Sequence, residues 1–317
     1  MIDFLRRAGL VGPGESPHVE ALAGGVSSEI WRVDLATGPV CVKRALAKLR
    51  VAQLWEAPIE RNRYEYEWFK IAHDAAPGSV PRVIARGDGL FAMEYLDYPA
   101  WKELLRKGQA EPAFAAQVGA ALAAIHVATA AREDIARRFP TDAIFHAIRL
   151  EPYILATAGK HPDLKDHLAS LATHTASIKR CLVHGDVSPK NILVRPQGPV
   201  FLDAECAWYG DPAFDLAFCL NHLLLKCVWV PQARQRFLDC FDALAGAYLS
   251  AVSFEDVEER AASLLPVLLL ARVDGKSPVE YLEQAEKERV RVSARQLILH
   301  PEKSLEGLRK AWQESST

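Results

Sequence analysis

The segment at residues 182–194 places an aspartate and an asparagine five positions apart, in a polar loop between two apolar β-type runs. Phosphoryl transfer needs a carboxylate that orients the attacking hydroxyl and accepts its proton, and an amide oxygen that holds a metal ion on the triphosphate. Asp186 and Asn191 have the side chains for these two tasks. The same residues also suit an ordinary hairpin turn, which Asp and Asn often shape.

A second metal-binding carboxylate is expected where the next strand ends. Residues 200–202 form an apolar run after the turn at 196–199, and Asp203 and Glu205 follow it. We predict that Asp203 is a metal ligand beside Asn191, because Mg²⁺ prefers oxygen ligands. On extended backbone the Glu205 side chain would point the same way, and it would either reach the metal through water or bond the loop backbone.

Three segments together resemble the aminoglycoside phosphotransferase and choline kinase superfamily. They are the His-Gly-Asp-x-x-x-x-Asn loop at 184–191, the Asp-x-Glu segment at 203–205 and Gly-Asp-Pro-Ala-Phe-Asp-Leu-Ala at 210–217. The resemblance implies a bilobal, protein-kinase-like α+β fold, with an antiparallel β-sheet lobe that carries a helix and a larger, mainly helical lobe. It also implies a small-molecule kinase that uses ATP and Mg²⁺ to phosphorylate a hydroxyl of a metabolite or an aminoglycoside-like acceptor.

The hydrophobic period of the chain changes near residue 97. Before it, short alternating runs such as 29–35 indicate strands, and after it Phe114, Val118 and Leu122 follow helical spacing. We therefore expect a nucleotide-binding β lobe at 1–96. A helical lobe with the catalytic loop, the metal site and the acceptor pocket is expected at 97–317.

The β lobe contains a glycine-rich turn and a strand lysine. The turn includes Gly24, Gly25, Ser27 and Ser28. Glycines there would let backbone N–H groups approach phosphates, although a plain hairpin also needs them. Lys43, on the third expected strand, has the position of a phosphate-pairing lysine, with an exposed strand lysine as the alternative.

A helix glutamate is expected to hold that lysine in place. Glu65 and Glu67 both lie in the helical segment at 61–71, and Glu65 is favoured because it shares a face with Trp68 and Phe69. Residues 46–59 are expected to form an extra helix that ends before Pro58.

Residues 89–97 are expected to form a strand that becomes the linker between the lobes. The resemblance makes this segment the hinge. Backbone groups of Glu94, Tyr95 and Leu96 would then bind adenine, and Met93 would line the pocket. An apolar core strand with nothing bound is the alternative.

Several polar residues are expected to support the catalytic loop. His184 would brace it through its ring nitrogens, and Asp215 would anchor it from the following helix. Where many members of the resembled family have His-Pro-Gly, this chain has Ser188, Pro189 and Lys190. Lys190 would either neutralise the transferred phosphate or point to solvent.

The acceptor pocket is expected in the helical lobe after residue 217. Asp274, in the charged segment 272–278, could bind an amine or hydroxyls of the acceptor. A helix-capping turn, with Pro278 starting the next helix, is the favoured alternative. The last hundred residues mix charge signs, which favours a neutral or mixed-charge metabolite over a polycationic antibiotic.

The bulk properties exclude some classes of partner. The 317 residues carry a formal charge of −2, which gives no general attraction to nucleic acid or to an anionic membrane. Six scattered cysteines and a charged N-terminal start favour a reducing cytoplasm. The apolar stretch at 264–271 is too short to span a bilayer and indicates a buried helix. Oligomeric state stays open.

Two other functional classes remain in view. A pseudokinase scaffold is disfavoured because every catalytic position is filled. A protein kinase is disfavoured because Asp203 is followed by Ala204 and Glu205 rather than Phe-Gly, and only seven residues separate it from Asp211.

Overall fold

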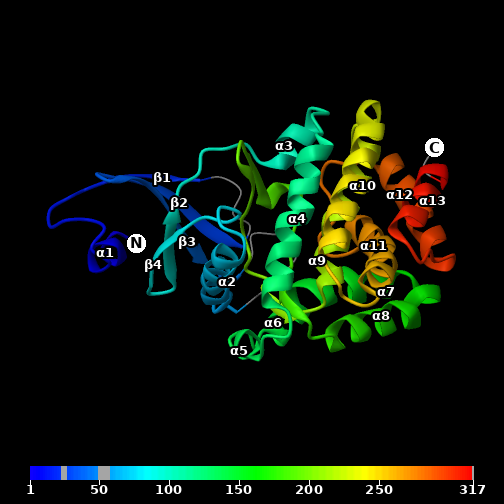
Figure 1. The fold of residues 1–317 in the computed structure, drawn as a ribbon, viewed down its shortest axis with the longest axis horizontal. Helices are drawn as coiled ribbons and strands as arrows, with labels where there is room; N and C mark the ends of the chain where they lie inside the picture. The colour runs from blue at the N-terminus through cyan, green and yellow to red at the C-terminus, as the bar shows by residue number, and fades with distance from the viewer. Residues whose placement is uncertain (23–26, 49–57, 316–317) are drawn as a thin grey trace.

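The computed structural model describes residues 1–22, 27–48 and 58–315. Figure 1 shows a β-rich part, formed by the first third of the chain, beside a larger helical part. The β-rich part holds a five-stranded antiparallel sheet in the order β1-β2-β3-β5-β4. Its strands are β1 (His18–Ala21), β2 (Ser28–Leu35), β3 (Gly38–Ala45), β4 (Val83–Gly87) and β5 (Leu90–Glu94).

Strand alternation decides which side chains face the helical part. On β3, Val40 and Val42 pack with Phe4 and Leu5 of α1 (Ile2–Arg7) under one face of the sheet. The alternate positions, among them Lys43, point to the opposite face. There Trp68 and Phe69 of α2 (Arg61–Ala75) join the main core of the molecule.

The helical part contains several helices and two small two-stranded antiparallel sheets, one formed by β6 with β9 and one by β7 with β8. Its first elements are α3 (Trp101–Arg106), α4 (Pro112–Thr129), α5 (Glu133–Ala136), α6 (Asp142–Phe145), the π-helix η1 (His146–Leu155), α7 (Ala156–Lys160), η2 (Pro162–Leu164) and α8 (Lys165–Ser177). The hairpin region follows with β6 (Cys181–Val183), η3 (Pro189–Asn191), β7 (Ile192–Arg195), β8 (Gly198–Phe201) and β9 (Trp208–Gly210). The chain ends with α9 (Pro212–Trp229), η4 (Pro231–Ala233), α10 (Arg234–Ala251), α11 (Val257–Asp274), α12 (Gln284–Leu299) and α13 (Leu305–Ser315).

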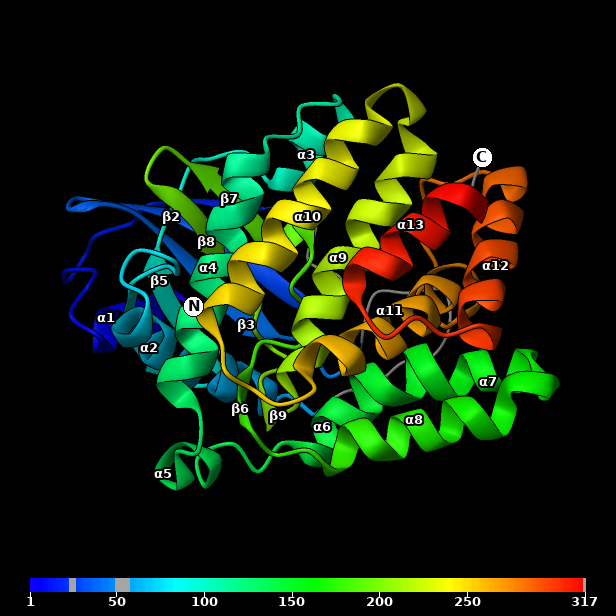
Figure 2. The ribbon, with the colours of Figure 1, turned by 45° about the vertical axis from the view of Figure 1, so that its right-hand side comes forward.

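Helix α9 forms the centre of the helical part, and α10 and α11 pack against it (Figure 2). Its residues 212–228 are all buried, as expected of a helix that is apolar on nearly every side. Asp211 caps it by accepting the Ala213 N–H at 3.0 Å, and Pro212 occupies its first turn.

Helix α4 runs alongside α10, as both views show. The two helices approach closely at Gly119, where a Cβ atom would lie 2.3 Å from the Leu244 carbonyl oxygen. Among the described residues, α4 is long and apolar enough to cross a membrane by length and composition alone, and half of it is buried within the fold.

The predicted α+β, bilobal, protein-kinase-like fold is confirmed, and residues 264–271 are buried in α11 as expected. The prediction that Pro278 begins a helix is wrong. Helix α12 begins at Gln284, where Glu283 and Glu286 form a reciprocal capping box. Most of the extra helix expected at 46–59 lies outside the described residues. The division at 96/97 stays a prediction, because one apolar core is continuous from the sheet into the helices.

Candidate active site

The loop after β6 is fixed to the helical core by one buried carboxylate. Asp215, in the first turn of α9, accepts the backbone N–H groups of His184 and Gly185 at 2.7 Å each. His126 of α4 lies 3.3 Å from the same carboxylate through Nε2, and its Nδ1 lies 2.8 Å from the Tyr248 hydroxyl. Asp215 therefore has the anchoring position that the sequence predicted, and His126 has a structural one.

His184 braces the loop from both sides of its ring. Its Nδ1 accepts the Asp186 N–H at 3.1 Å, and its Nε2 lies 3.0 Å from the Leu202 carbonyl oxygen. Burial lowers the pKa of His184, so the neutral ring with a proton on Nε2 satisfies both contacts. The ring thus links the catalytic loop to the segment that leads into Asp203.

Two cations contact the Asp186 carboxylate. Arg149 Nη2 lies 3.0 Å and Lys190 Nζ 3.3 Å from Asp186 Oδ2. Burial would raise the pKa of Asp186, but Lys190 and Arg149 outweigh it and hold that pKa below its usual range. Asp186 is therefore ionised at neutral pH. Lys190 contacts the carboxylate while its side chain stays 56% exposed, so it is neither remote from the site nor buried in it.

Sequence reasoning did not identify Arg149. It lies on the π-helix η1, is 6% exposed, and also donates to the carbonyl oxygens of Ile148 (2.6 Å) and Gly185. The available signal was a lone arginine in an otherwise apolar run before Pro152. Wide helical turns of this kind often mark functional sites.

Asn191 and Asp203 lie at the same end of the β7–β8 hairpin, just before its first strand and just after its second. Asn191 Nδ2 donates to the Asp186 carbonyl oxygen at 3.1 Å, which leaves Oδ1 as an acceptor, and the Asn191 carbonyl oxygen accepts the Leu202 N–H at 2.8 Å. Asp203 has a φ of +66°, a left-handed conformation that Asp tolerates better than most residues. The extended backbone expected from Asp203 to Glu205 is therefore wrong.

Lys43 lies between two carboxylates. Its Nζ is 2.7 Å from Glu65 Oε1 and also contacts Asp203 Oδ1. Glu67 instead pairs with Arg138 at 2.5 Å, so Glu65 is the partner of Lys43. Burial, together with the negative charges of Asp203 and Glu205, raises the pKa of Glu65 to about 8, although Lys43 opposes this rise.

Glu205 has a partner that the sequence did not suggest. Its Oε2 accepts from Arg61 Nε at 2.9 Å, which replaces both expected roles, a water-bridged metal contact and a bond to loop backbone. The buried Arg61 of α2 also donates to the carbonyl oxygens of Ser27 and Leu46, each at 2.6 Å. One guanidinium thus joins the edge of the glycine-rich turn to the metal-binding segment.

The remaining nucleotide-side predictions are only partly covered by the structure. Gly24 and Gly25 lie outside the described residues, and Ser27 and Ser28 are buried where β2 begins. Two buried hydroxyl oxygens, Oγ of Ser28 and of Ser188, have no hydrogen-bond partner among the described residues.

The predicted hinge follows directly on the sheet. Met93 and Glu94 end β5, and Glu94 exchanges hydrogen bonds with the backbone of Arg82. Tyr95 and Leu96 come next along the chain. Adenine binding by this segment stays a prediction.

Asp274 is not placed as an acceptor-binding residue. Its carboxylate accepts from Arg291 Nε and Nη2 at 2.7 Å each and lies 2.9 Å from His161 Nε2. With both oxygens engaged, Asp274 links α11, α12 and the end of α7. The residue of this segment that turns toward the catalytic loop is Arg272, whose Nη1 lies 3.3 Å from the Tyr153 hydroxyl.

Comparison with known proteins identifies the family. A model of the phosphotransferase enzyme family (APH) matches residues 18–237, which is more than half of the chain. The chain belongs to the phosphotransferase enzyme family. The match includes every site residue discussed above from Ser27 to Asp215, and it ends before α11. The family assignment therefore does not extend to Arg272 or Asp274.

Relatives agree with the assignment. The methylthioribose kinase of Pectobacterium carotovorum subsp. carotovorum (strain PC1) is 26% identical over 265 residues, which cover 73% of this chain and 66% of that kinase. This chain thus spans just under two thirds of the length of that relative. A choline kinase from Cryptosporidium parvum Iowa II superposes with a TM-score of 0.57 at 11% identity, covering 94% of this chain and 96% of that one.

A third relative was solved with ligands. The amicoumacin kinase hAmiN, in complex with AMP-PNP, Ca²⁺ and Ami, superposes with a TM-score of 0.57 at 14% identity, over 93% of this chain and 91% of that one. At these identities the two solved structures show that the fold is shared.

The oxygen atoms of Asn191 and Asp203 are suitable ligands for a hard cation such as Mg²⁺. Among the described residues there is no cluster of three or more His, Cys, Asp or Glu side chains that could hold a metal by itself. Mg²⁺ commonly takes one or two protein ligands and completes its shell with substrate phosphates and water. Asn191 Oδ1 and the Asp203 carboxylate, with Lys43 beside them, match that pattern.

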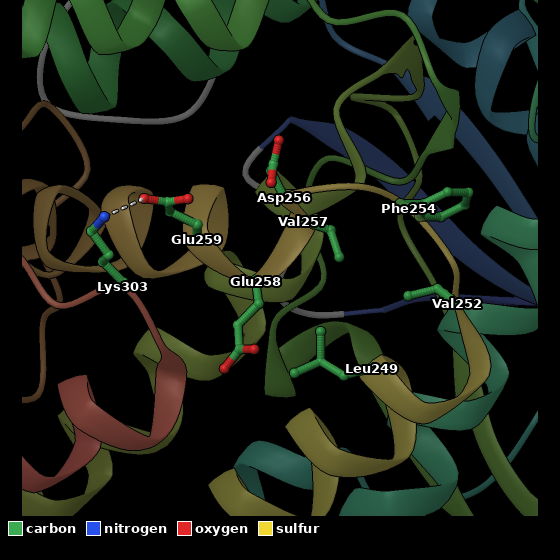
Figure 3. A pocket seen from close by; sticks show the side chains of 8 residues that line it. All are labelled: Leu249, Val252, Phe254, Asp256, Val257, Glu258, Glu259 and Lys303. Carbon is green, nitrogen blue, oxygen red and sulfur yellow. Dashed lines mark ion pairs between the residues drawn. The ribbon is translucent and has the colours of Figure 1, made fainter.

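One pocket in the described part of the chain lies away from these residues. It has a volume of about 380 Å³ and lies between the end of α10 and the start of α11 (Figure 3). Its lining includes Phe254, Asp256 and Glu259, with Lys303 4.0 Å from Glu259. None of the residues of the loop at 184–191 lines it. The candidate active site therefore does not coincide with this pocket.

Proposed function

We propose that this protein is a Mg²⁺-dependent kinase that transfers the γ-phosphoryl group of ATP to a hydroxyl of a small molecule. The observation that carries the proposal is the convergence of three distant segments. Lys43 and Glu65 come from the β-rich part, Asp186 and Asn191 from the segment between β6 and β7, and Asp203 from the segment between β8 and β9. These are the parts that phosphoryl transfer requires.

In the proposed reaction each side chain has a task. Asp186, ionised and fixed by the loop, orients the acceptor hydroxyl and accepts its proton as the new O–P bond forms and the bond to the ADP oxygen breaks. Such a base contributes about 10²- to 10⁴-fold in rate. Lys190 Nζ, 3.3 Å from the carboxylate, supplies positive charge where the phosphoryl group passes.

On the nucleotide side, Lys43 exchanges its contact with Asp203 for the α- and β-phosphates. Asn191 and Asp203 would hold Mg²⁺, which neutralises charge on the triphosphate when bound. Glu65 keeps the lysine in position. Ser27, Ser28 and the turn that precedes them border the phosphates, and the segment from Met93 to Leu96 contacts adenine. The AMP-PNP and Ca²⁺ in the hAmiN structure support the use of a nucleotide with a divalent metal.

A small hydroxyl metabolite is the best-supported class of acceptor. The methylthioribose kinase relative supports it, and the short segment between Asp203 and Asp211 offers no long activation segment of the protein-kinase type. The described cysteines are all buried and free, in keeping with a protein of the reducing cytoplasm.

The test is Mg²⁺-dependent ADP formation across a panel of sugars, amino alcohols, hydroxy acids and aminoglycosides, with Asp186→Asn beside the wild type. We expect one class of compound to stimulate ADP formation, and Asp186→Asn to lower kcat by about 10²-fold or more while nucleotide affinity is kept. An unchanged kcat in Asp186→Asn would exclude this mechanism. Failure of MgATP to bind at all would exclude the kinase function.

A further inference from the structure

One buried histidine, His222, lies within electrostatic reach of four basic side chains. Burial lowers the pKa of His222 on α9 well below its usual range, and the cations that lower it further come from four elements. They are Lys102 of α3, Lys190 of η3, Lys226 of α9 and Arg272 of α11. These four residues are the basic cluster. Because each acts on the same imidazole, they lie around a common region.

The basic cluster is connected to the catalytic aspartate through Tyr153. The guanidinium carbons of Arg149 and Arg272 lie 5.5 and 5.7 Å from the centre of the Tyr153 ring. Arg149 in turn contacts Asp186 at 3.0 Å. Arg272 is therefore separated from Asp186 by the side chains of Tyr153 and Arg149. A small acceptor whose hydroxyl lies at Asp186 could extend to the basic cluster.

Two members of the basic cluster have no carboxylate partner among the described residues. Lys102 pairs with Glu280 at 2.6 Å and Lys190 with Asp186. Lys226, only 1% exposed, places Nζ 3.6 Å from the centre of the Tyr281 ring and 4.2 Å from that of Trp229. The amine thus lies against two aromatic rings, which give it no hydrogen-bond acceptor.

Arg272 and Tyr281 also have donors without acceptors. Arg272 Nη1 binds neutral oxygens only, those of Tyr153 and Ser277, and its Nε is buried without a partner. The buried Tyr281 hydroxyl likewise has no partner among the described residues. Buried donors are nearly always satisfied in folded proteins, so these two donors, beside an amine that has no carboxylate partner, indicate a missing acceptor.

We propose that Lys226, Arg272 and Tyr281 form a subsite for an anionic group of the acceptor, a carboxylate or a phosphate, so that the substrate is a hydroxyl compound with a negative charge. The inference rests on the proposed kinase function and narrows its substrate class. An anion supplies the acceptor oxygens that the three donors lack. Burial and the neighbouring Lys102 lower the pKa of Lys226 to about 6, so the anion binds together with a proton at neutral pH.

The first arm of the test measures anion binding without turnover. The full chain, loaded with Mg²⁺ and AMP-PNP so that the nucleotide phosphate site is filled, is titrated calorimetrically with inorganic phosphate and with acetate. We expect saturable binding that weakens at least about tenfold in Arg272→Gln and in Lys226→Met. Lys226→Met keeps the aliphatic stem against Trp229 and Tyr281. Lys276→Gln is the matched control, because Lys276 is exposed and pairs with Glu151.

The second arm compares matched acceptors: glycerate with glycerol, ribose 5-phosphate with ribose, and choline as a cation. We expect the anionic member of each pair to have the higher kcat/KM. We expect Arg272→Gln to remove that preference by raising the KM for the anionic acceptor. Preference for glycerate identifies a carboxylate as the natural group, and preference for ribose 5-phosphate a phosphate.

The outcomes separate the two proposals. The subsite is overturned if Asp186-dependent ADP formation occurs only with neutral or cationic acceptors. It is also overturned if anion binding is unchanged in both variants. Either result leaves the kinase function standing. Anion binding that depends on Arg272 and Lys226, without any Asp186-dependent ADP formation, supports the site and overturns its place in a kinase.

Discussion

The two cations at Asp186 differ in accessibility, and this difference decides which one can be tested cleanly. Arg149 is buried and also supports the backbone of Gly185 and Ile148, so its removal would disturb the loop. Lys190 has no such structural bonds and is half exposed. Substitution of Lys190 therefore changes the electrostatics of the carboxylate with little effect on its position.

Lys190→Gln is expected to shift the acidic limb of the kcat/KM profile to higher pH. The pKa of Asp186 is held low in part by Lys190, and the ionised form is the active one. Loss of the cation raises that pKa, so activity is lost earlier as pH falls. The shift will be modest, because the lysine is partly screened by solvent.

The measurement is kcat/KM from pH 4.5 to 8, with the exposed Lys165→Gln on α8 as control. An identical acidic limb in Lys190→Gln and wild type would contradict this electrostatic role.

At the level of elements, the anchor of the catalytic loop is a single helix residue. Asp215→Asn replaces two acceptor oxygens with one, so one of the His184 and Gly185 N–H groups loses its partner. A buried unsatisfied donor costs about 1–3 kcal/mol. We expect a lower thermal midpoint and a fall in kcat with nearly unchanged affinity for AMP-PNP, measured by thermal unfolding, steady-state kinetics and nucleotide titration. A kcat equal to that of wild type would show that the loop does not need this anchor.

Helix α9 contains a buried amine whose effect on stability depends on pH. The pKa of Lys226 is lowered from 10.5 to about 6 by burial and by Lys102 and Arg272. The unfolded chain therefore binds more protons than the folded one between these values, and stability rises with pH in that window. Lys226→Met should remove this dependence.

The gain in the free energy of unfolding from Lys226→Met is expected to be largest near pH 6 and to fade toward pH 10. Urea unfolding at pH 6, 8 and 10 measures it, with Lys160→Met on the exposed end of α7 as control. A gain that is the same at all three pH values would mean that the lysine is charged in the fold and held by its two aromatic neighbours.

Local patterns predicted the elements and residues whose signals are short in sequence. Helical spacing was enough to choose Glu65 over Glu67, and Lys43 was predicted from its place on the third expected strand. His184 was predicted to brace the loop in which its partner Asp186 also lies. Asp215 was predicted from the resembled segment at 210–217, although it anchors His184 and Gly185 from far along the chain.

Contacts between distant segments were not predictable in this way. Arg149 reaches Asp186 only because the widened turn of η1 directs it there, and no periodic pattern encodes a π-helix. Asp274 looked available in the sequence because Arg291 and His161 come to it from other helices. The same tertiary packing turns Arg272 toward the catalytic loop.

At the scale of the whole molecule, Arg61 connects the two parts across the nucleotide side of the site. It bonds the ends of β2 and β3 through Ser27 and Leu46, and it pairs with Glu205 just after Asp203. The guanidinium is almost completely buried, and so is most of Glu205. Breaking a buried pair by removing one partner leaves an uncompensated charge and costs about 3–5 kcal/mol.

Arg61→Met is therefore expected to destabilise the protein by about 3–5 kcal/mol and to weaken binding of Mg²⁺ with AMP-PNP, because Ser27 and Leu46 are no longer joined to the segment that follows Asp203. The double variant Arg61→Met with Glu205→Gln tests the cause. Removing the orphaned carboxylate should recover stability, whereas nucleotide affinity should stay low, since the bonds to Ser27 and Leu46 are still missing.

The cycle is completed by denaturant unfolding and nucleotide titration of the wild type, both single variants and the double variant. Recovery of both quantities together would assign the effect to the Glu205 charge alone and would remove Arg61 as a connection between the two parts.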